Sequence, residues 1–376
     1  MVENAPKFHV IGRKDVVNSK IFGKIDLRLC LKCGHVFNCE FGTDDNDNLG
    51  QFLTNTPINA SMLHRHQTTV EYLAPKSEKK LSVLDVGAGS GALAAAFADR
   101  GHSVTVVEPS QMLDRSAMES FGVEVINSVW PPPLLETRKF DLILCVQVLE
   151  HTNNPCEFLR SLVERLSDQG RIYLEIPSGD WVVDNSSLID IHYPHINYFR
   201  SSSIKYLLHS TSVDLTRSRE LLNGRDVGLT LERAASGSKS KSFRSESKVE
   251  SIDLKKSFEN GRIQIDRRLS KRSYAVYGAN AGLQAAFGFF PKLSPSFVFD
   301  DTPAYENCFA YSINNQFQIR KPCQDDFVNL DAIVIASYIH DAVISEKLRD
   351  QGFAGEILSL RPESDFSGKV KSLFSL

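Results

Sequence analysis

Short apolar runs alternate with amphipathic stretches along most of this chain. Apolar runs of strand length, separated by helical spacers, are typical of a mostly parallel sheet with helices on both faces. The pattern predicts a helix over 61–73 and strands near 82–86, 103–107, 123–126, 140–146 and 171–176, with two more near 213–216 and 227–233. We therefore predict an α/β domain, doubly wound, over residues 56–235.

The same alternation restarts nearer the carboxyl end of the chain. Tyr274–Tyr277 reads as a strand, Gly278–Gly282 as a glycine turn that opens a helix, and Asp300 and Asp301 end the next apolar run. This pattern predicts a second, smaller Rossmann-like unit over 272–376. A segment rich in serine and lysine, followed by a helix over about 252–270, makes residues 236–271 a connection between the two units.

Residues 1–55 are predicted to form a small irregular module. Cys30 and Cys33 have the spacing of half a zinc knuckle, and Cys39 follows. A structural zinc ion needs four ligands, and the matching upstream positions hold Phe8 and Ile11 instead of cysteine. We expect no metal here, with apolar packing in its place. The alternative is zinc held by the three cysteines and a histidine, either His35 or His9.

The glycine turn after the first strand of the larger domain carries the strongest chemical signal. Asp85 is followed by Gly87, Ala88 and Gly89, and Glu108 ends the next strand. Glycines let a ligand approach the backbone, and an acidic residue at the second strand is placed to accept the hydroxyls of a ribose. The sequence therefore predicts a site for a cofactor that contains a nucleoside.

A fourth apolar run identifies the cofactor class. The glycines and Ala92 also fit the dinucleotide pattern G-x-G-x-x-A, but Asp85 would face a cationic ligand better than a pyrophosphate. The run FDLILCVQVLEH, ending in Glu150 and His151, together with the glycine turn resembles class I S-adenosylmethionine-dependent methyltransferases. The resemblance implies a seven-stranded sheet and a set of residues around S-adenosyl-L-methionine. These are Asp85, Gly87, Ala88 and Gly89, Glu108 at the ribose, Ser128 and Val129 beside the adenine, and Val146 and Gln147 at the methionine end.

The order of the three regions resembles the sugar C-methyltransferases over nearly the whole chain. That resemblance implies a degenerate amino-terminal zinc module, a methyltransferase core, and a carboxy-terminal unit that helps to hold a nucleotide-linked sugar. It also implies a place in surface-polysaccharide or antibiotic biosynthesis.

The loop DIHYPHINYF, after the fifth strand, holds the candidate catalytic residues. It concentrates His192, His195 and Tyr198 where open α/β sheets bind ligands. We expect His195 to act as a base with a pKa near neutrality, oriented by His192 or Tyr198; the alternative is that these rings only pack the loop. The resembling enzymes carry a glutamate before the histidine, where this chain has Pro194. The acceptor atom, whether carbon, oxygen or nitrogen, therefore stays open.

The composition limits the kinds of partner that we expect this protein to bind. A net charge of −3 gives no basic face for nucleic acid, and no apolar run approaches the roughly 20 residues that span a bilayer. No signal-peptide core is visible and seven cysteines fit reduced thiols, so we expect a cytoplasmic enzyme with a small-molecule substrate. A non-catalytic scaffold that keeps the fold is the alternative. A nicotinamide-dependent oxidoreductase is disfavoured because Gly278–Gly282 lacks G-x-G-x-x-G.

Overall fold

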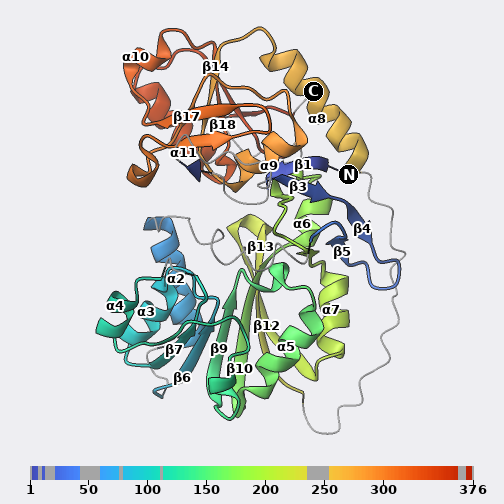
Figure 1. Cartoon of the computed structure of the whole chain (residues 1–376), viewed down its shortest axis with the longest axis vertical. Coiled ribbons are helices and arrows are strands. Elements are labelled where there is room, and N and C mark those ends of the chain that lie inside the picture. Colours follow the sequence, from blue (N-terminus) through green and yellow to red (C-terminus); the bar gives the residue numbers. More distant parts are fainter. Residues whose placement is uncertain are drawn as a thin grey trace.

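The chain folds into two sheet-centred bodies that lie one above the other along the long axis of the molecule (Figure 1). The computed structural model describes residues 2–6, 11–12, 22–42, 60–75, 79–110, 113–234, 254–362 and 370–374. Among these residues, no helix combines the length and the apolar character needed to cross a membrane.

The lower body contains a seven-stranded sheet in the order β12-β13-β10-β9-β6-β7-β8. Its strands are β6 (Ser82–Val86), β7 (Ser103–Val107), β8 (Glu124–Ile126), β9 (Phe140–Val146), β10 (Leu166–Pro177), β12 (Val213–Leu221) and β13 (Asp226–Arg233). Neighbours from β8 to β10 pair in parallel, whereas β13 runs antiparallel to both β10 and β12. The predicted α/β class and its strands are confirmed.

Helices cover both faces of this sheet (Figure 1). One face carries α2 (Ala60–Leu73), α3 (Ala92–Asp99) and α4 (Arg115–Ser120), and the other carries α5 (Pro155–Glu164) and α7 (Ser201–His209). A short helix, α6 (Gly179–Asp184), and a two-residue strand, β11 (Asn197–Tyr198), follow β10. Each face has its own buried apolar cluster, with Phe97 and Val70 in one and Leu162 and Ile204 in the other. Burial on both sides explains why the strands read as continuous apolar runs.

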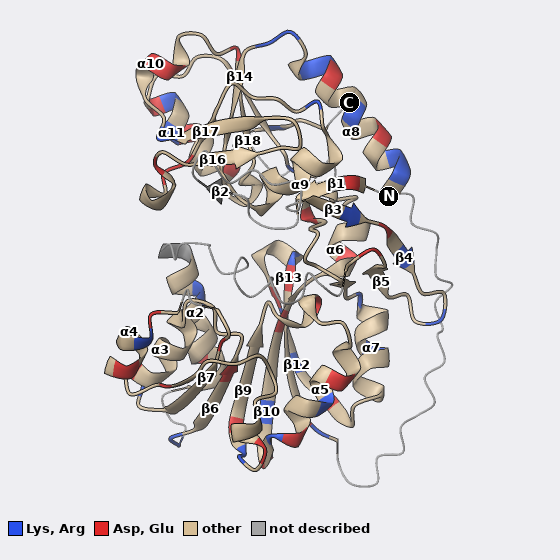
Figure 2. Cartoon of the chain, in the orientation of Figure 1, with Lys and Arg blue, Asp and Glu red and all other residues tan. Residues whose placement is uncertain are grey.

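The upper body contains the second sheet, in the order β2-β16-β17-β15-β14-β18-β19-β20. Its strands are β14 (Tyr274–Tyr277), β15 (Val298–Phe299), β16 (Phe309–Tyr311), β17 (Gln316–Arg320), β18 (Ala332–Ile335), β19 (Glu356–Ser359), β20 (Lys371–Ser372) and β2 (Ile11–Gly12). Its helices are α8 (Leu254–Leu269), α9 (Ala281–Phe289), α10 (Gln324–Phe327) and α11 (Asp341–Asp350). Charges of both signs are spread along α8 (Figure 2). The predicted second Rossmann-like sheet is present.

The amino-terminal strands are shared among several sheets. They are β1 (Val2–Pro6), β3 (Phe22–Ile25), β4 (Leu27–Leu29) and β5 (Val36–Asn38). β1 pairs with β3, β5 pairs with β4 and with β11 of the lower body, and β2 joins the upper sheet beside β16. The described part of the expected 1–55 module therefore ties the two bodies together, and the domain limits at 55, 235 and 271 stay predictions.

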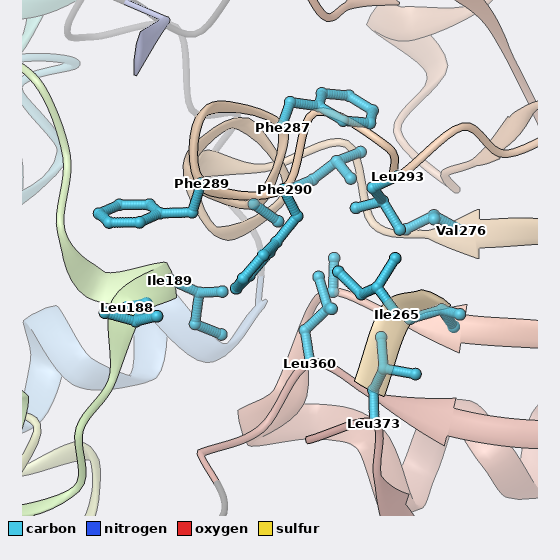
Figure 3. Close-up of a cluster of buried hydrophobic side chains, with 14 of the residues drawn as sticks. Leu188, Ile189, Ile265, Val276, Phe287, Phe289, Phe290, Leu293, Leu360 and Leu373 are labelled. Carbon is cyan, nitrogen blue, oxygen red and sulfur yellow. The ribbon is translucent and has the colours of Figure 1, made fainter. Parts of the chain in front are cut away.

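One apolar cluster runs from the lower body into the upper body. It includes Leu188 and Ile189 of the short helix η5 (Leu188–Asp190), which pack with Phe289 at the end of α9 and with Phe290 directly after it (Figure 3). Val2 of β1 belongs to the same cluster. The two bodies are therefore joined by a continuous core.

A buried carboxylate adds a polar link to this core. Asp190, 6% exposed, accepts hydrogen bonds from Trp181 Nε1 at 3.2 Å, Arg225 Nε at 2.7 Å and Tyr338 Oη at 2.8 Å, and from the Ser187 hydroxyl. Tyr338 comes from the upper body and the other donors from the lower body. Burial alone would raise the pKa of Asp190, but the positive charge of Arg225 and these donors hold it below its ordinary value.

We expect Asp190→Asn to destabilise the protein by about 3–5 kcal/mol, because it leaves Arg225 without its buried counter-charge. A carboxyl whose folded pKa is depressed stabilises the fold above its unfolded pKa of about 3.9, and this stabilisation is lost as pH falls through the folded pKa. Urea titrations from pH 3 to 7 should therefore show that lowering the pH reduces the free energy of unfolding less in the variant than in wild type. The exposed Asp214→Asn is the matched control; an Asp190→Asn variant as stable as this control would contradict the assignment.

Candidate functional site

The glycine turn after β6 is held open by backbone geometry and one carboxylate. Gly87 has φ +71°, and a Cβ there would lie 2.6 Å from Val148 Cγ2, so no other residue fits. Glu108 accepts from Gly89 N at 2.8 Å and from Ser110 N at 2.8 Å. The predicted ribose acceptor therefore lies at the glycine turn, where its two oxygens also fix the shape of the loop.

Asp85 is buried beside this turn. It is 2% exposed, and its Oδ2 has no hydrogen-bond partner in the described part of the chain. Burial, with a smaller contribution from the negative charge of Glu108, raises the pKa of Asp85 to about 7. An unpaired buried carboxylate of this kind is stabilised by a cation, as the sequence analysis expected.

A cavity of about 390 Å³ lies against the turn and is lined by both bodies. The lower body contributes Asp85, Gly87, Ala88 and Gly89, Val146 and Gln147, and the histidines His66, His151, His192 and His195. The upper body contributes one face of α9. Six of the nine predicted cofactor residues therefore surround a single cavity with two of the three predicted catalytic residues.

Three ionisable groups, a buried carboxyl group and two partly buried imidazoles, meet beside the cavity. The ligand atoms of Glu150, His151 and His195 all lie within 4.8 Å of one another, and the ring centroids of His195 and His192 are 4.9 Å apart. Burial lowers the pKa of His151 to about 4. Burial, and then the nearby positive charges of His192, His151 and Arg225, place the pKa of His195 well below its ordinary value. The expectation that His195 titrates near neutrality is therefore wrong.

The remaining predicted catalytic residue has another contact. Tyr198 is buried, and its hydroxyl accepts from His192 N at 3.0 Å and donates to His192 O at 3.1 Å. It does not line the cavity. Tyr198 therefore orients the backbone of His192 within the protein.

Pro194 also acts through its backbone. Its carbonyl accepts a hydrogen bond of 2.7 Å from His151 Nδ1. This contact leaves His151 Nε2 on the side of Glu150, whose Oε1 lies 3.9 Å away. The loop thus fixes which nitrogen of His151 carries the proton.

Two predicted adenine neighbours lie away from the cavity. Ser128 and Val129 follow β8, do not line the cavity, and Val129 is 70% exposed. Their predicted place beside the adenine therefore has no support from the lining of the cavity.

The amino-terminal cysteines do not assemble into a four-ligand group among the described residues. Cys39 gathers with Asp26 and Glu40, apart from Cys30 and Cys33. His35 Nε2 is 3.0 Å from Asn197 Oδ1 instead. His9 lies outside the described residues.

Sequence reasoning missed two polar residues of the cavity wall. His66 on α2 and Gln284 on α9 both line the cavity, and both carry buried atoms without a hydrogen-bond partner in the part of the chain that the structure describes. Helical periodicity assigned them to helices, but only the meeting of the two bodies places them at one site.

Residues 59–215 match the family model described as a methyltransferase domain. This part of the chain is a class I methyltransferase domain. The cofactor of such domains is S-adenosylmethionine. The match ends before β13 and includes neither the upper body nor the amino-terminal strands.

Curated relatives match a shorter stretch of the chain than the family model does. The mitochondrial ubiquinone biosynthesis O-methyltransferase of Schizosaccharomyces pombe is 37% identical over 101 residues, which are 24% of this chain and 36% of the relative. The ubiquinone biosynthesis O-methyltransferase of Rickettsia typhi is 27% identical over 124 residues, 29% of this chain and 49% of the relative. The chain therefore spans half or less of the length of these relatives.

Solved structures give a weaker likeness. Magnesium protoporphyrin IX methyltransferase from Synechocystis PCC 6803, solved with bound S-adenosylhomocysteine, has 16% identity and a TM-score of 0.38, over 51% of this chain and 94% of that chain. A protein from Pyrococcus horikoshii OT3 has 18% identity and a TM-score of 0.40, over 50% and 98%. These scores are too low to carry a structural argument.

The residues at the glycine turn fit S-adenosylmethionine. Asp85 offers a buried carboxylate oxygen, without a partner among the described residues, for the cationic ammonium group, and Gly87 lines the cavity beside it. Glu108 does not line the cavity and both of its oxygens already accept backbone hydrogen bonds, so its place at the ribose stays a prediction.

We expect S-adenosylhomocysteine to bind roughly eightfold more tightly at pH 7.5 than at pH 6. Asp85, with its pKa of about 7, gains the charge that pairs with the ligand ammonium over this range. Calorimetric titration at several pH values measures the dissociation constant, Kd. Asp85→Asn should weaken binding and remove the pH dependence, whereas Asp214→Asn should keep the wild-type affinity and the wild-type pH dependence. A pH-independent Kd in wild type would show that Asp85 does not face the ammonium.

Proposed function

We propose that the protein transfers a methyl group from S-adenosylmethionine to an oxygen atom of a small molecule. The observation that carries this proposal is the shared cavity, in which Asp85 and the glycine turn line the same space as His151, His192 and His195. This shared lining supports a methyl-donor site and a proton-accepting group in one cavity.

The chemistry asks little of the protein beyond placement. The cofactor supplies an already activated methyl group, and the protein must align the acceptor, exclude water and remove one proton. Alignment is worth about 7–11 kcal/mol in favourable cases. Val146 and Phe289 contribute apolar lining to the cavity.

His195 is the proposed proton acceptor. Its lowered pKa keeps the imidazole neutral at physiological pH, so it is ready to take a proton. Glu150 lies within reach of this ring, and burial raises the pKa of its carboxyl group well above the ordinary value, which favours the protonated, neutral form. The proposed acceptor of the proton is therefore the imidazole of His195.

An oxygen acceptor is favoured over a carbon acceptor. A neutral imidazole of low basicity is poorly suited to removing a proton from carbon beside a ketone, and Pro194 stands where the sugar C-methyltransferases carry a glutamate. The names of the curated relatives also describe O-methyltransferases. Nitrogen remains an alternative acceptor, because it too needs little basicity.

For the substrate, we propose a nucleotide-linked sugar. The order of the regions resembles the sugar C-methyltransferases, and the upper body supplies one wall of the cavity through α9. A phenolic precursor of the ubiquinone type is the second candidate, favoured by the names of the relatives. Incubation with labelled S-adenosylmethionine and a panel of uridine- and thymidine-diphosphate sugars and dihydroxybenzoates separates the two by the product that gains label.

We expect His195→Ala to leave the Kd for S-adenosylhomocysteine within about twofold and to lower kcat by about 10²- to 10⁴-fold, the usual contribution of a general base. The exposed His64→Ala, on α2, is the matched control and should retain full turnover. A fully active His195→Ala variant would remove this residue from the mechanism.

If the protein is a non-catalytic scaffold, the wild-type protein should transfer no methyl group. A scaffold would bind S-adenosylhomocysteine, or nothing, and would label no member of the panel. Binding followed by transfer to any small molecule excludes it.

A further inference from the structure

The cavity wall formed by α9 carries one polar side chain. Ala281, Gln284, Ala285 and Phe289 line the cavity from this helix, and their spacing places them on one face. α9 lies on the side of the upper body that faces the methyltransferase domain (Figure 1). The wall is thus apolar except at Gln284, and the small alanines on either side leave room beside its carboxamide.

The side-chain amide of Gln284 is buried without a hydrogen bond among the described residues. It is 4% exposed, and neither its Oε1 nor its Nε2 has a partner in the described part of the chain. An unpaired buried amide is costly, and native proteins keep few of them. Its position on the cavity wall provides a reason, because a ligand in the cavity can supply the missing partners.

We propose that Gln284 binds the methyl acceptor through a paired hydrogen bond. A carboxamide offers a donor and an acceptor side by side, so it complements a group that offers the same two functions in reverse. The imide edge of uracil or thymine and a sugar hydroxyl both have this chemistry. Phe289, on the same wall, offers an apolar surface to a flat ring. The inference rests on the proposed methyl transfer, and it assigns substrate selection to the upper body.

A site built around a buried amide rejects ligands that lack the matching groups, because the amide then stays unpaired. Gln284 therefore acts in selection of the acceptor, separately from the cofactor residues Asp85 and Glu108 and from His195.

The test replaces the carboxamide by an apolar group of similar size. We expect Gln284→Leu to lower kcat/KM for the preferred acceptor by about tenfold or more, mainly through KM, with the Kd for S-adenosylhomocysteine within about twofold of wild type. Its Tm should equal or exceed that of wild type, because an unpaired buried polar group has been removed. Unchanged kcat/KM, or an equal loss of cofactor affinity, would overturn the proposal.

Gln264→Leu is the matched control. Gln264 lies on α8 of the same body, is 1% exposed, has an unpaired Oε1 and lies outside the cavity lining. It should leave KM unchanged. If Gln284→Leu does not fold, Gln284→Met and Gln284→Glu repeat the measurement, and Glu, which loses the donors but keeps an acceptor, should also raise KM.

Calorimetry with partial ligands separates the two chemistries. Loss of uridine- or thymidine-diphosphate binding in Gln284→Leu assigns the residue to the base, and loss of binding only for the complete nucleotide sugar assigns it to a sugar hydroxyl. Wild type that binds these nucleotides but neither binds nor uses the cofactor would refute the proposed function and leave Gln284 testable by nucleotide binding. Wild-type turnover that Gln284→Leu retains would refute only the role of Gln284.

Discussion

The carboxylate of Asp190 is the interaction on which the arrangement of the site depends. It is buried, and its donors come from three parts of the lower body and from Tyr338 of the upper body. Separating the bodies would leave a charged group without one of the partners that make its burial tolerable. Because Asp190 stands two residues before His192, this single anchor fixes the histidine loop relative to the wall formed by α9. The apolar cluster around Leu188 and Phe290 extends this contact between the two bodies (Figure 3).

The two bodies stabilise their glycine turns in the same way and use them differently. In the lower body Glu108 accepts from the N–H groups of Gly89 and Ser110, and in the upper body Asp300 accepts from Ala279 N at 2.8 Å and Thr302 N at 2.9 Å. Only the first turn has a buried, unpaired carboxylate beside it among the described residues, namely Asp85. The upper body instead presents the side of α9 to the cavity. Similar local structure therefore does not imply a second cofactor site, because the chemistry depends on what faces the turn.

Much of this architecture is readable from local sequence, and the rest depends on contacts between distant segments. The strands of the lower sheet and the turn at Gly87 follow from apolar runs and from a conformation that favours glycine. The histidine loop and Glu150 are visible as separate motifs, but their meeting within 4.8 Å depends on how β11 is held. The sequence did not allow us to predict what the amino-terminal strands contact. β5 pairs with β11, 160 residues further along the chain, and β1 packs on α9. Gln284 carries no signal of its own, because an isolated glutamine on a helix is ordinary until a second body closes over it.

Pro194 shows how a position can serve a site without a reactive side chain. Its carbonyl oxygen accepts a hydrogen bond from His151 Nδ1, and the other nitrogen of that ring therefore lies toward Glu150. Burial then shifts the carboxyl and the imidazoles in opposite directions, the pKa of Glu150 upward and those of His151 and His195 downward. All three groups are thereby favoured in their neutral forms, which is the state that such a cluster can hold without a counter-ion. In the proposed mechanism, a proton accepted by one of the imidazoles becomes the net charge of this cluster, because the carboxyl group of Glu150 is already favoured in its protonated form. A weakly basic imidazole of this kind is better suited to an oxygen acceptor than to carbon.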